Sequence, residues 1–192
     1  MKKYESLHDR LRGPIAEALK KELNITNVHA LPRIQKITVN VGMNRSKMDS
    51  KESHEFVAKS LAEMTGQKAV FTLSRKAISN FKIREGLKVG AVVTLHGRRM
   101  EEFLDRLLSY VLPRIRDFRG VTTKLDGHGN YAIGLKDHSI FPEIPPADAG
   151  KIFGVQIQIT TNAKTDAPAR ALLKHMGVPF RPERTEKKSS KS

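Results

Sequence analysis

The residues best suited to chemistry in this sequence are cations, and they gather around the stretch from Thr72 to Gly97. From Lys68 to Lys88, six Lys or Arg residues stand against a single acid, Glu85. A solvated surface usually mixes both signs of charge, so this excess favours contact with phosphate groups. The second half of the stretch alternates apolar and polar residues as a strand does. The pattern therefore predicts a basic loop mounted on a strand.

One aromatic residue, Phe81, lies among these cations. An exposed ring beside cations can stack on an unpaired nucleobase. The alternative is a core residue that fills the space beneath the loop. We favour the core position for Phe81.

No residue pattern in the chain is typical of an enzyme. There is no cysteine, which excludes a thiolate nucleophile, a thiolate zinc site and a disulfide framework. The seven histidines do not follow the spacing of metal motifs, and no carboxylates are paired for acid–base work. We therefore expect no catalytic residue, no metal, no cofactor and no small-molecule substrate.

The whole chain is strongly basic, with a formal net charge of +15 over 192 residues. Such an excess favours a polyanionic partner, and nucleic acid is the simplest one, although some basic proteins bind neither RNA nor DNA. An anionic membrane is the other polyanion. We expect no membrane binding, because no helix pairs a strongly cationic face with bulky aromatic residues and no apolar run could span a bilayer. Since no signal peptide is found, a cytoplasmic protein is expected.

Three strands with one apolar and one polar face are predicted around Val39, Val93 and Ile157. One covered face and one open face favour an antiparallel or mixed sheet over a buried parallel one. Helices alternate with these strands, so the predicted fold class is α+β. We expect a single domain over residues 1–180 and a disordered basic tail over 181–192, which contains no apolar residue.

Periodicity and capping signals predict four helical regions. The first covers residues 7–23 and is interrupted at Gly13-Pro14, because proline cannot donate the helical hydrogen bond. A second is expected to begin at Asp49, in the cap position, and to end at Gly66. The third is predicted over residues 100–111, and the last is capped by Thr165 or Asp166 and ends at Gly177.

The polar positions of the three strands have a common chemistry. If the strands share a sheet, they form one face that is rich in hydrogen-bonding groups and contains no Asp or Glu. Such a face suits phosphate, ribose 2′-OH and base-edge contacts, whereas the plain alternative is an ordinary solvated sheet face. The positions are Lys36, Thr38 and Asn40, then Thr94 and His96, then Gln156, Gln158 and Thr160.

Three arginines, Arg114, Arg116 and Arg119, follow the helix predicted over residues 100–111. They can bind phosphate, or they can pair with acids such as Asp117. The sequence leaves both interpretations open.

With these segments in place, the chain resembles the ribosomal protein L5 family, the universal large-subunit proteins that carry 5S ribosomal RNA. The matching motifs run in order along nearly the whole chain, and the two longest are highly specific. They are Pro32-Arg-Ile34 with Lys36-Ile-Thr-Val-Asn-Val-Gly42, Gly66-Gln-Lys68, Arg75-Lys76 with Phe81-Lys-Ile-Arg84, Val93-Thr-Leu95, Pro113-Arg-Ile-Arg-Asp-Phe-Arg-Gly120, Asp126-Gly with Gly129-Asn-Tyr131, and Ile140-Phe-Pro-Glu-Ile144.

The resemblance implies a curved, mostly antiparallel sheet with helices packed on one face. It also implies a structural constituent of the large subunit that anchors 5S rRNA in the central protuberance. The partners it implies are 5S rRNA, 23S rRNA, P-site tRNA and small-subunit ribosomal protein S13. The alternative function is an RNA-binding regulator or chaperone that acts off the ribosome.

Site residues follow from the same resemblance, together with the polar strand positions. The candidate 5S rRNA-binding residues are Arg33, Lys36, Thr38, Asn40, Gly42, Lys68, Thr94 and His96. The loop expected to reach P-site tRNA presents Arg75, Lys76, Asn80, Lys82 and Arg84. The surface expected to bridge to the small subunit contains Arg114, Arg116, Asp117, Arg119, Asp126 and His128. The chain has His at 96 and 128, where members of the family often carry Arg.

Overall fold

The computed structural model of the chain describes residues 6–43, 50–145 and 152–181. Helices and strands alternate along the chain in an order that confirms the α+β fold class. The elements are α1 (Leu7–Arg12), α2 (Pro14–Leu23), η1 (Val28–Ala30), β1 (Ile34–Gly42), α3 (Lys51–Thr65), β2 (Val70–Leu73), η2 (Ser79–Phe81), β3 (Lys88–Leu95), α4 (Gly97–Arg106), η3 (Leu107–Val111), η4 (Leu112–Arg114), β4 (Tyr131–Leu135), η5 (His138–Ile140), β5 (Val155–Thr161) and α5 (Asp166–His175).

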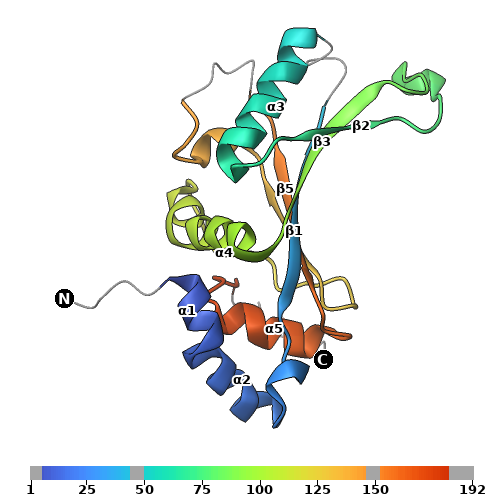
Figure 1. The fold of residues 1–192 in the computed structure, drawn as a ribbon. Helices are drawn as coiled ribbons and strands as arrows, with labels where there is room; N and C mark the ends of the chain where they lie inside the picture. Colours follow the sequence, from blue (N-terminus) through green and yellow to red (C-terminus); the bar gives the residue numbers. More distant parts are fainter. Residues whose placement is uncertain (1–5, 44–49, 146–151, 182–192) are drawn as a thin grey trace, which may run out of the picture.

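The five strands form one twisted, open sheet in the order β2-β3-β1-β5-β4 (Figure 1). All four pairings are antiparallel, as the alternating strand patterns predict. The central strand, β1, pairs with β3 on one side and β5 on the other, so that Ile37 lies between Leu95 and Ile159. The three strands whose open faces were predicted to be polar are therefore neighbours.

One face of the sheet is the core of the protein. Ile37, Val39 and Val41 of β1 are fully buried on this face, where the helices pack. Figure 1 shows α3 and α4 against the sheet, with α1, α2 and α5 gathered near the start of β1. The polar residues that alternate with this apolar row must then point to the opposite face, because successive strand side chains alternate between faces.

The first two helices meet at the predicted break, where α1 ends at Arg12 and α2 begins at Pro14. Helix α3 starts one residue later than predicted. Its cap is Ser50, whose hydroxyl accepts the backbone N–H of Ser53 at 3.1 Å. The cap must directly precede the first helical residue, which is Lys51, so the prediction of Asp49 was wrong; that residue lies outside the described ranges. The helix ends at Gly66, as predicted.

The helix predicted over residues 100–111 begins earlier, at Gly97, and is α-helical only as far as Arg106. A wider π turn and a short 3-10 turn then lead the chain to Arg114. Pro113 has no backbone N–H to donate, so an α-helix could not continue through this position. Periodicity placed the buried face correctly but could not reveal the change of helix type.

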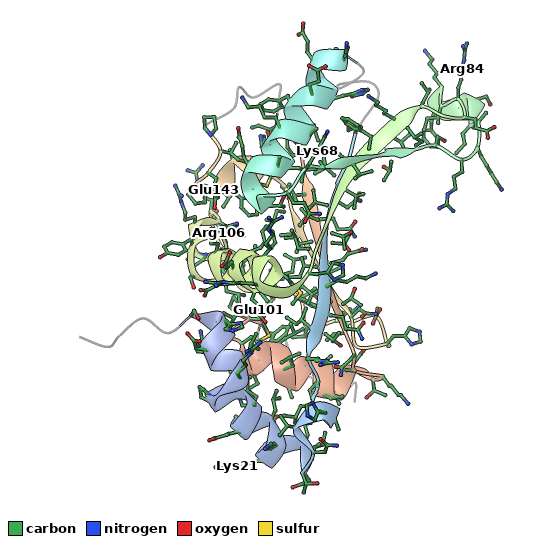
Figure 2. All side chains as sticks on the ribbon, viewed as in Figure 1. Lys21, Lys68, Arg84, Glu101, Arg106 and Glu143 are labelled. Carbon is green, nitrogen blue, oxygen red and sulfur yellow. The ribbon has the colours of Figure 1, made fainter. Side chains whose placement is uncertain are left out.

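The irregular segment around Phe141–Ile144 is fixed by one arginine (Figure 2). The Arg106 Nε atom lies 3.0 Å from an oxygen of Glu143, and its Nη2 donates to the carbonyl of Met64 at 2.9 Å. A single side chain of α4 therefore holds both this segment and the C-terminal end of α3. Phe141 stacks on Phe103 of α4, with ring centroids 6.0 Å apart.

Candidate nucleic-acid interface

The open sheet face brings the predicted polar residues of three strands together. Thr38 lies directly between Thr94 of β3 and Gln158 of β5. Asn40 is opposite Gln156, one step further along the same face. Residues more than 50 positions apart in the sequence thus become a continuous row across the sheet. This arrangement depends entirely on the strand order and register.

The outward positions of the described strands contain no Asp or Glu. Thr38, Asn40 and Thr94 are half-buried, so their side chains are supported by neighbours while still reaching solvent. Lys36 and Lys68 are exposed and add positive charge to the face. Val92 and the exposed Val70 lie on the same face, beside Asn40. A surface that is free of acids and carries amides, hydroxyls and cations can approach phosphate and ribose groups without repelling them.

One glycine, Gly90, allows β3 to pack closely against both of its neighbouring strands. Gly90 is paired with Gly42. A Cβ atom on Gly90 would come within 2.8 Å of both the Thr72 hydroxyl and the Val41 carbonyl oxygen. No real Cβ tolerates such a distance, so glycine at this position is a requirement of the sheet.

Gln67 is part of this surface although its type and position alone did not mark it as a site residue. Its side-chain amide donates to the backbone carbonyl of Thr94 at 3.1 Å. The contact joins the turn after α3 to the polar row on β3. The only local signal was the Gly66-Gln67-Lys68 motif, which could not say which strand Gln67 would touch.

The start of β1 and the end of β3 are fixed by backbone contacts. His96 is exposed, and its Nδ1 atom lies 3.2 Å from the carbonyl oxygen of Gln35. A carbonyl can only accept, so Nδ1 is the donor in this contact. Arg33 donates its backbone N–H to the Asn162 side chain at 2.7 Å, and its side chain is exposed.

The basic loop forms the tip of the β2–β3 hairpin, which projects away from the body of the protein (Figure 1). Backbone hydrogen bonds join Ser74 to Leu87 at 2.8 Å and Ile78 to Ile83 at 2.9 and 3.1 Å. Figure 2 shows the Arg84 side chain at the far end of the hairpin. The loop is therefore an ordered extension that carries its charges beyond the sheet.

All the cations predicted for this loop, with Asn80, are exposed. Among residues 6–43, 50–145 and 152–181, none of these cations forms an ion pair. Phe81 is 69 % exposed, so its prediction as a core residue was wrong. The hairpin leaves the sheet before it reaches Phe81, and the loop has no core beneath it to fill. Ile78, at 46 % exposed, adds a second apolar side chain to the same tip.

The residues predicted to bridge to the small subunit fall in two places. Arg114, Arg116, Asp117 and Arg119 line a hollow of about 710 Å³ beside β4, the edge strand. Within the described part of the chain, none of these three arginines pairs with Asp117. The described residues therefore favour the phosphate-binding interpretation of this segment over pairing with Asp117.

Asp126 and His128 lie instead on the turn that precedes β4. The Asp126 carboxylate accepts the backbone N–H groups of His128 and Asn130, both at 2.9 Å, and the side-chain amide of Asn130 at 2.7 Å. The bonds from Asn130, the side-chain one first, lower the pKa of Asp126, and the contact with His128 adds to them. Asp126 thus clamps its own turn, whereas the His128 side chain is exposed.

The segment after the arginines is held by the C-terminal end of the described chain. Val121 donates to the carbonyl of Pro179, and Arg181 donates to the carbonyl of Val121, both at 2.8 Å. Gly120 has a φ of 91°, and a Cβ there would lie 2.8 Å from the Arg181 nitrogen. Arg181, where the disordered tail was predicted to begin, is thus bound to the body. Residues 182–192 lie outside the described ranges.

The described residues were also compared with the requirements of a metal site and of a membrane-spanning helix. They contain no group of three or more His, Cys, Asp or Glu side chains that could hold a metal ion. None of their helices has both the length and the apolar character needed to cross a membrane.

Taken together, the open face and the hairpin define a basic α+β protein whose surfaces suit a polyanion. The chain matches the family described as ribosomal protein L5 over residues 27–84, and the C-terminal part of the same ribosomal family over residues 88–180. The two matches together cover most of the described structure.

Curated relatives agree with these family matches. The large ribosomal subunit protein uL5 of Acidobacterium capsulatum is 51 % identical over 176 residues, which cover 91 % of this chain and 96 % of the relative. The uL5 of Rubrobacter xylanophilus is 49 % identical over 177 residues, 92 % and 98 % of the two chains, and that of Halothermothrix orenii 47 % identical over 175 residues, 91 % and 97 %.

The chain belongs to the ribosomal protein L5 family. It is a structural protein of the large ribosomal subunit and not an enzyme, and it works on the ribosome in the cytoplasm.

Proposed function

We propose that the open sheet face binds 5S rRNA and anchors it in the central protuberance. The observation that carries this proposal is the acid-free row in which Thr38 lies between Thr94 and Gln158. Because the opposite side of β1 is fully buried, the row is held rigid before any RNA arrives. Preorganised polar groups are what selective contact with ribose and base edges requires. Asn40 and Thr94 are the central contacts, with Lys36 and Lys68 on nearby phosphates.

The β2–β3 hairpin is proposed to contact P-site tRNA. Its exposed Arg75, Lys76, Lys82 and Arg84 have no anionic partner among the described residues, so they can neutralise backbone phosphates. Exposed Phe81 can stack on a base at the same tip. The hairpin extends beyond the sheet, so one RNA can be held by the face while a second is reached by the tip (Figure 1).

The third proposed contact is the bridge to small-subunit ribosomal protein S13. Arg114, Arg116 and Arg119, with exposed Asp117 between them, offer both signs of charge along the hollow beside β4. His128 extends this surface from the neighbouring turn. Asp126 contributes by fixing that turn, since three N–H donors already occupy its carboxylate. Contact with 23S rRNA would complete the anchoring of the protein in the subunit.

The decisive experiment measures binding to 5S rRNA and to a scrambled RNA of equal length over a salt series. Site-specific binding should favour 5S rRNA by about 4 kcal/mol or more. Equal affinity for the two RNAs, lost steeply with salt, would leave only counterion release by a basic surface.

A matched pair of variants makes the same experiment sharper. Lys36→Ala and Lys174→Ala each remove one exposed cation, from the open face and from α5 respectively. Lys36→Ala should weaken RNA binding and lower the slope of log affinity against log salt by about 1, whereas Lys174→Ala, which lies away from the open face, should leave both unchanged. Co-sedimentation with large subunits at high salt separates this function from a regulator or chaperone that acts off the ribosome.

A further inference from the structure

The open face ends in a hollow beyond the central proposed 5S contacts, Asn40 and Thr94. It measures about 340 Å³ and lies where β4 and β5 meet the chain segment before the Asp126 turn. Ala132 of β4 and Gln158 and Thr160 of β5 line it from the sheet, and Lys124 and Leu125 line it from that segment. The hollow therefore opens on the same side of the sheet as Thr38 and Asn40.

The walls of this hollow are fixed in place. The Tyr131 hydroxyl donates to the carbonyl of Thr122, which holds the segment of Lys124 and Leu125 beside β4. The turn that follows is closed by the backbone bond from Asp126 to Asn130 at 3.3 Å and by the three bonds to the Asp126 carboxylate. The space exists because position 132 carries only a methyl group. A hollow with fixed walls is preformed, as small-ligand sites usually are.

The chemistry of the lining is mixed in a way that suits one nucleotide. Ala132 and half-buried Leu125 offer apolar surface to the flat face of a base. The Gln158 amide and the Thr160 hydroxyl can both donate and accept, as the edge of a base requires. Exposed Lys124 supplies the charge for a phosphate. Asp126 also lines the hollow, but its carboxylate is already occupied by N–H donors.

We propose that this hollow binds a single unpaired RNA nucleotide, with its base against Leu125 and Ala132 and its edge on Gln158 and Thr160. The inference rests on the proposed function, in which the open face binds ribosomal RNA. Lys36 is opposite Thr160 in the β1–β5 register, so an RNA strand on the face leads directly to the hollow. Unpaired nucleotides are the elements by which proteins recognise RNA sequence. The nucleotide comes either from 5S or from 23S rRNA.

Two variants and one control test the hollow in the full-length protein. Ala132→Leu fills the space from an exposed strand position, and Gln158→Ala removes the amide without filling it. Lys174→Ala, an exposed residue of α5 that does not line the hollow, is the control. Each is titrated with the four ribonucleoside 5′-monophosphates while backbone and side-chain amide NMR signals are followed. We expect saturable shifts at Ala132 and Gln158 for one base, lost in Ala132→Leu and retained in Lys174→Ala.

Binding to transcripts of 5S and 23S rRNA then identifies the source of the nucleotide. Ala132→Leu and Gln158→Ala should each weaken binding to one of the two RNAs by about tenfold, the size of one lost base contact. Unchanged binding to both RNAs, equal weakening toward a scrambled RNA, or no shift with any mononucleotide would overturn the proposal. The change of the salt slope in Lys36→Ala concerns the open face alone, so the two proposals fail separately.

Discussion

The open sheet face and the hairpin tip are both basic, but they are built in opposite ways. On the face, Thr38 and Asn40 are half-buried. They alternate along β1 with Ile37 and Val39, which are fully buried on the opposite side of the sheet. At the tip, Phe81 and Arg84 are exposed and have no core beneath them. One surface has its geometry set by the packing behind it, whereas the other has only the backbone bonds of its own hairpin.

This difference predicts different kinds of RNA contact. Side chains held in place lose little conformational entropy on binding, so the face can favour one RNA structure over others. Exposed Lys and Arg side chains at the tip contribute mainly through counterion release, which depends on salt and little on sequence. Under the proposed function, the face would keep one RNA permanently while the tip contacts another transiently. Four predictions test the contrast, beginning with the largest expected effect.

The double variant Asn40→Ala with Thr94→Ala should reduce the discrimination between 5S rRNA and scrambled RNA by about 3 kcal/mol, because it removes two preorganised contacts. Neither residue is charged, so the slope of log affinity against log salt should stay the same. Fluorescence anisotropy over a salt series measures both quantities. An equal loss of affinity for the two RNAs would show that the face does not select.

Gly90→Ala should lower the free energy of unfolding by about 2 kcal/mol, because the new Cβ would meet Thr72 and Val41 at 2.8 Å. Gly134→Ala is the matched control, since it also adds a methyl group on the open face but meets nothing within 4 Å. Its effect should stay within about 0.5 kcal/mol. Urea denaturation compares the two variants. Equal effects would mean that the β1–β3 pairing tolerates a wider spacing.

Phe81→Ala should leave the free energy of unfolding within about 0.5 kcal/mol of the wild type, since the ring is 69 % exposed. It should weaken the tRNA contact by about 1–2 kcal/mol through the loss of base stacking. The rate of tRNA release from the P site of ribosomes reconstituted with the variant measures this contact. A large loss of stability with no change in release would mean that the ring supports the hairpin fold instead.

The smallest expected effect concerns the packing behind the sheet. His138 is fully buried and stacked on Phe153, with ring centroids 3.8 Å apart, and Phe56 meets its edge. Burial lowers the pKa of His138, although the nearby charge of Asp137 opposes the shift. The folded protein therefore keeps this ring neutral at a pH where the unfolded chain has already protonated it.

Stability from this group is complete above the ordinary histidine pKa of about 6.5 and is lost as the pH falls below it. His138→Leu should therefore flatten the decline in unfolding free energy between about pH 7 and pH 5.5. His29→Gln, an exposed histidine, is the control and should keep the wild-type slope. Identical slopes in all three proteins would mean that His138 is protonated equally easily in the folded state.

Many of the strands and helix ends could be predicted from local sequence patterns. The alternation around Val39, Val93 and Ile157 predicted three strands with an acid-free face, and all three are neighbours in the sheet. The break at Gly13-Pro14 and the end of α3 at Gly66 were also predictable. These features depend only on a few consecutive residues, so the sequence of each segment is enough to predict them.

The errors arose where the answer depended on distant segments. The pattern around Phe81 could not show that the hairpin leaves the sheet, so a core position was a reasonable but wrong expectation. For Arg114, Arg116 and Arg119 the sequence left phosphate binding and pairing with acids open, because it does not show where Asp117 points. The Asp126 turn was readable as an Asp-Gly turn, but the sequence did not show that three donors occupy the carboxylate.

By itself, the sequence determined that this protein is basic, α+β, free of catalytic patterns and similar to a ribosomal family. These properties depend on residue types and on their spacing within short segments, and not on contacts between distant parts of the chain. Only the tertiary structure decided that Thr38 lies between Thr94 and Gln158, that Gln67 reaches Thr94, and that Ala132 leaves a hollow beside Gln158. Each of these depends on strand order and register, which are set when residues far apart in the chain bury a common core.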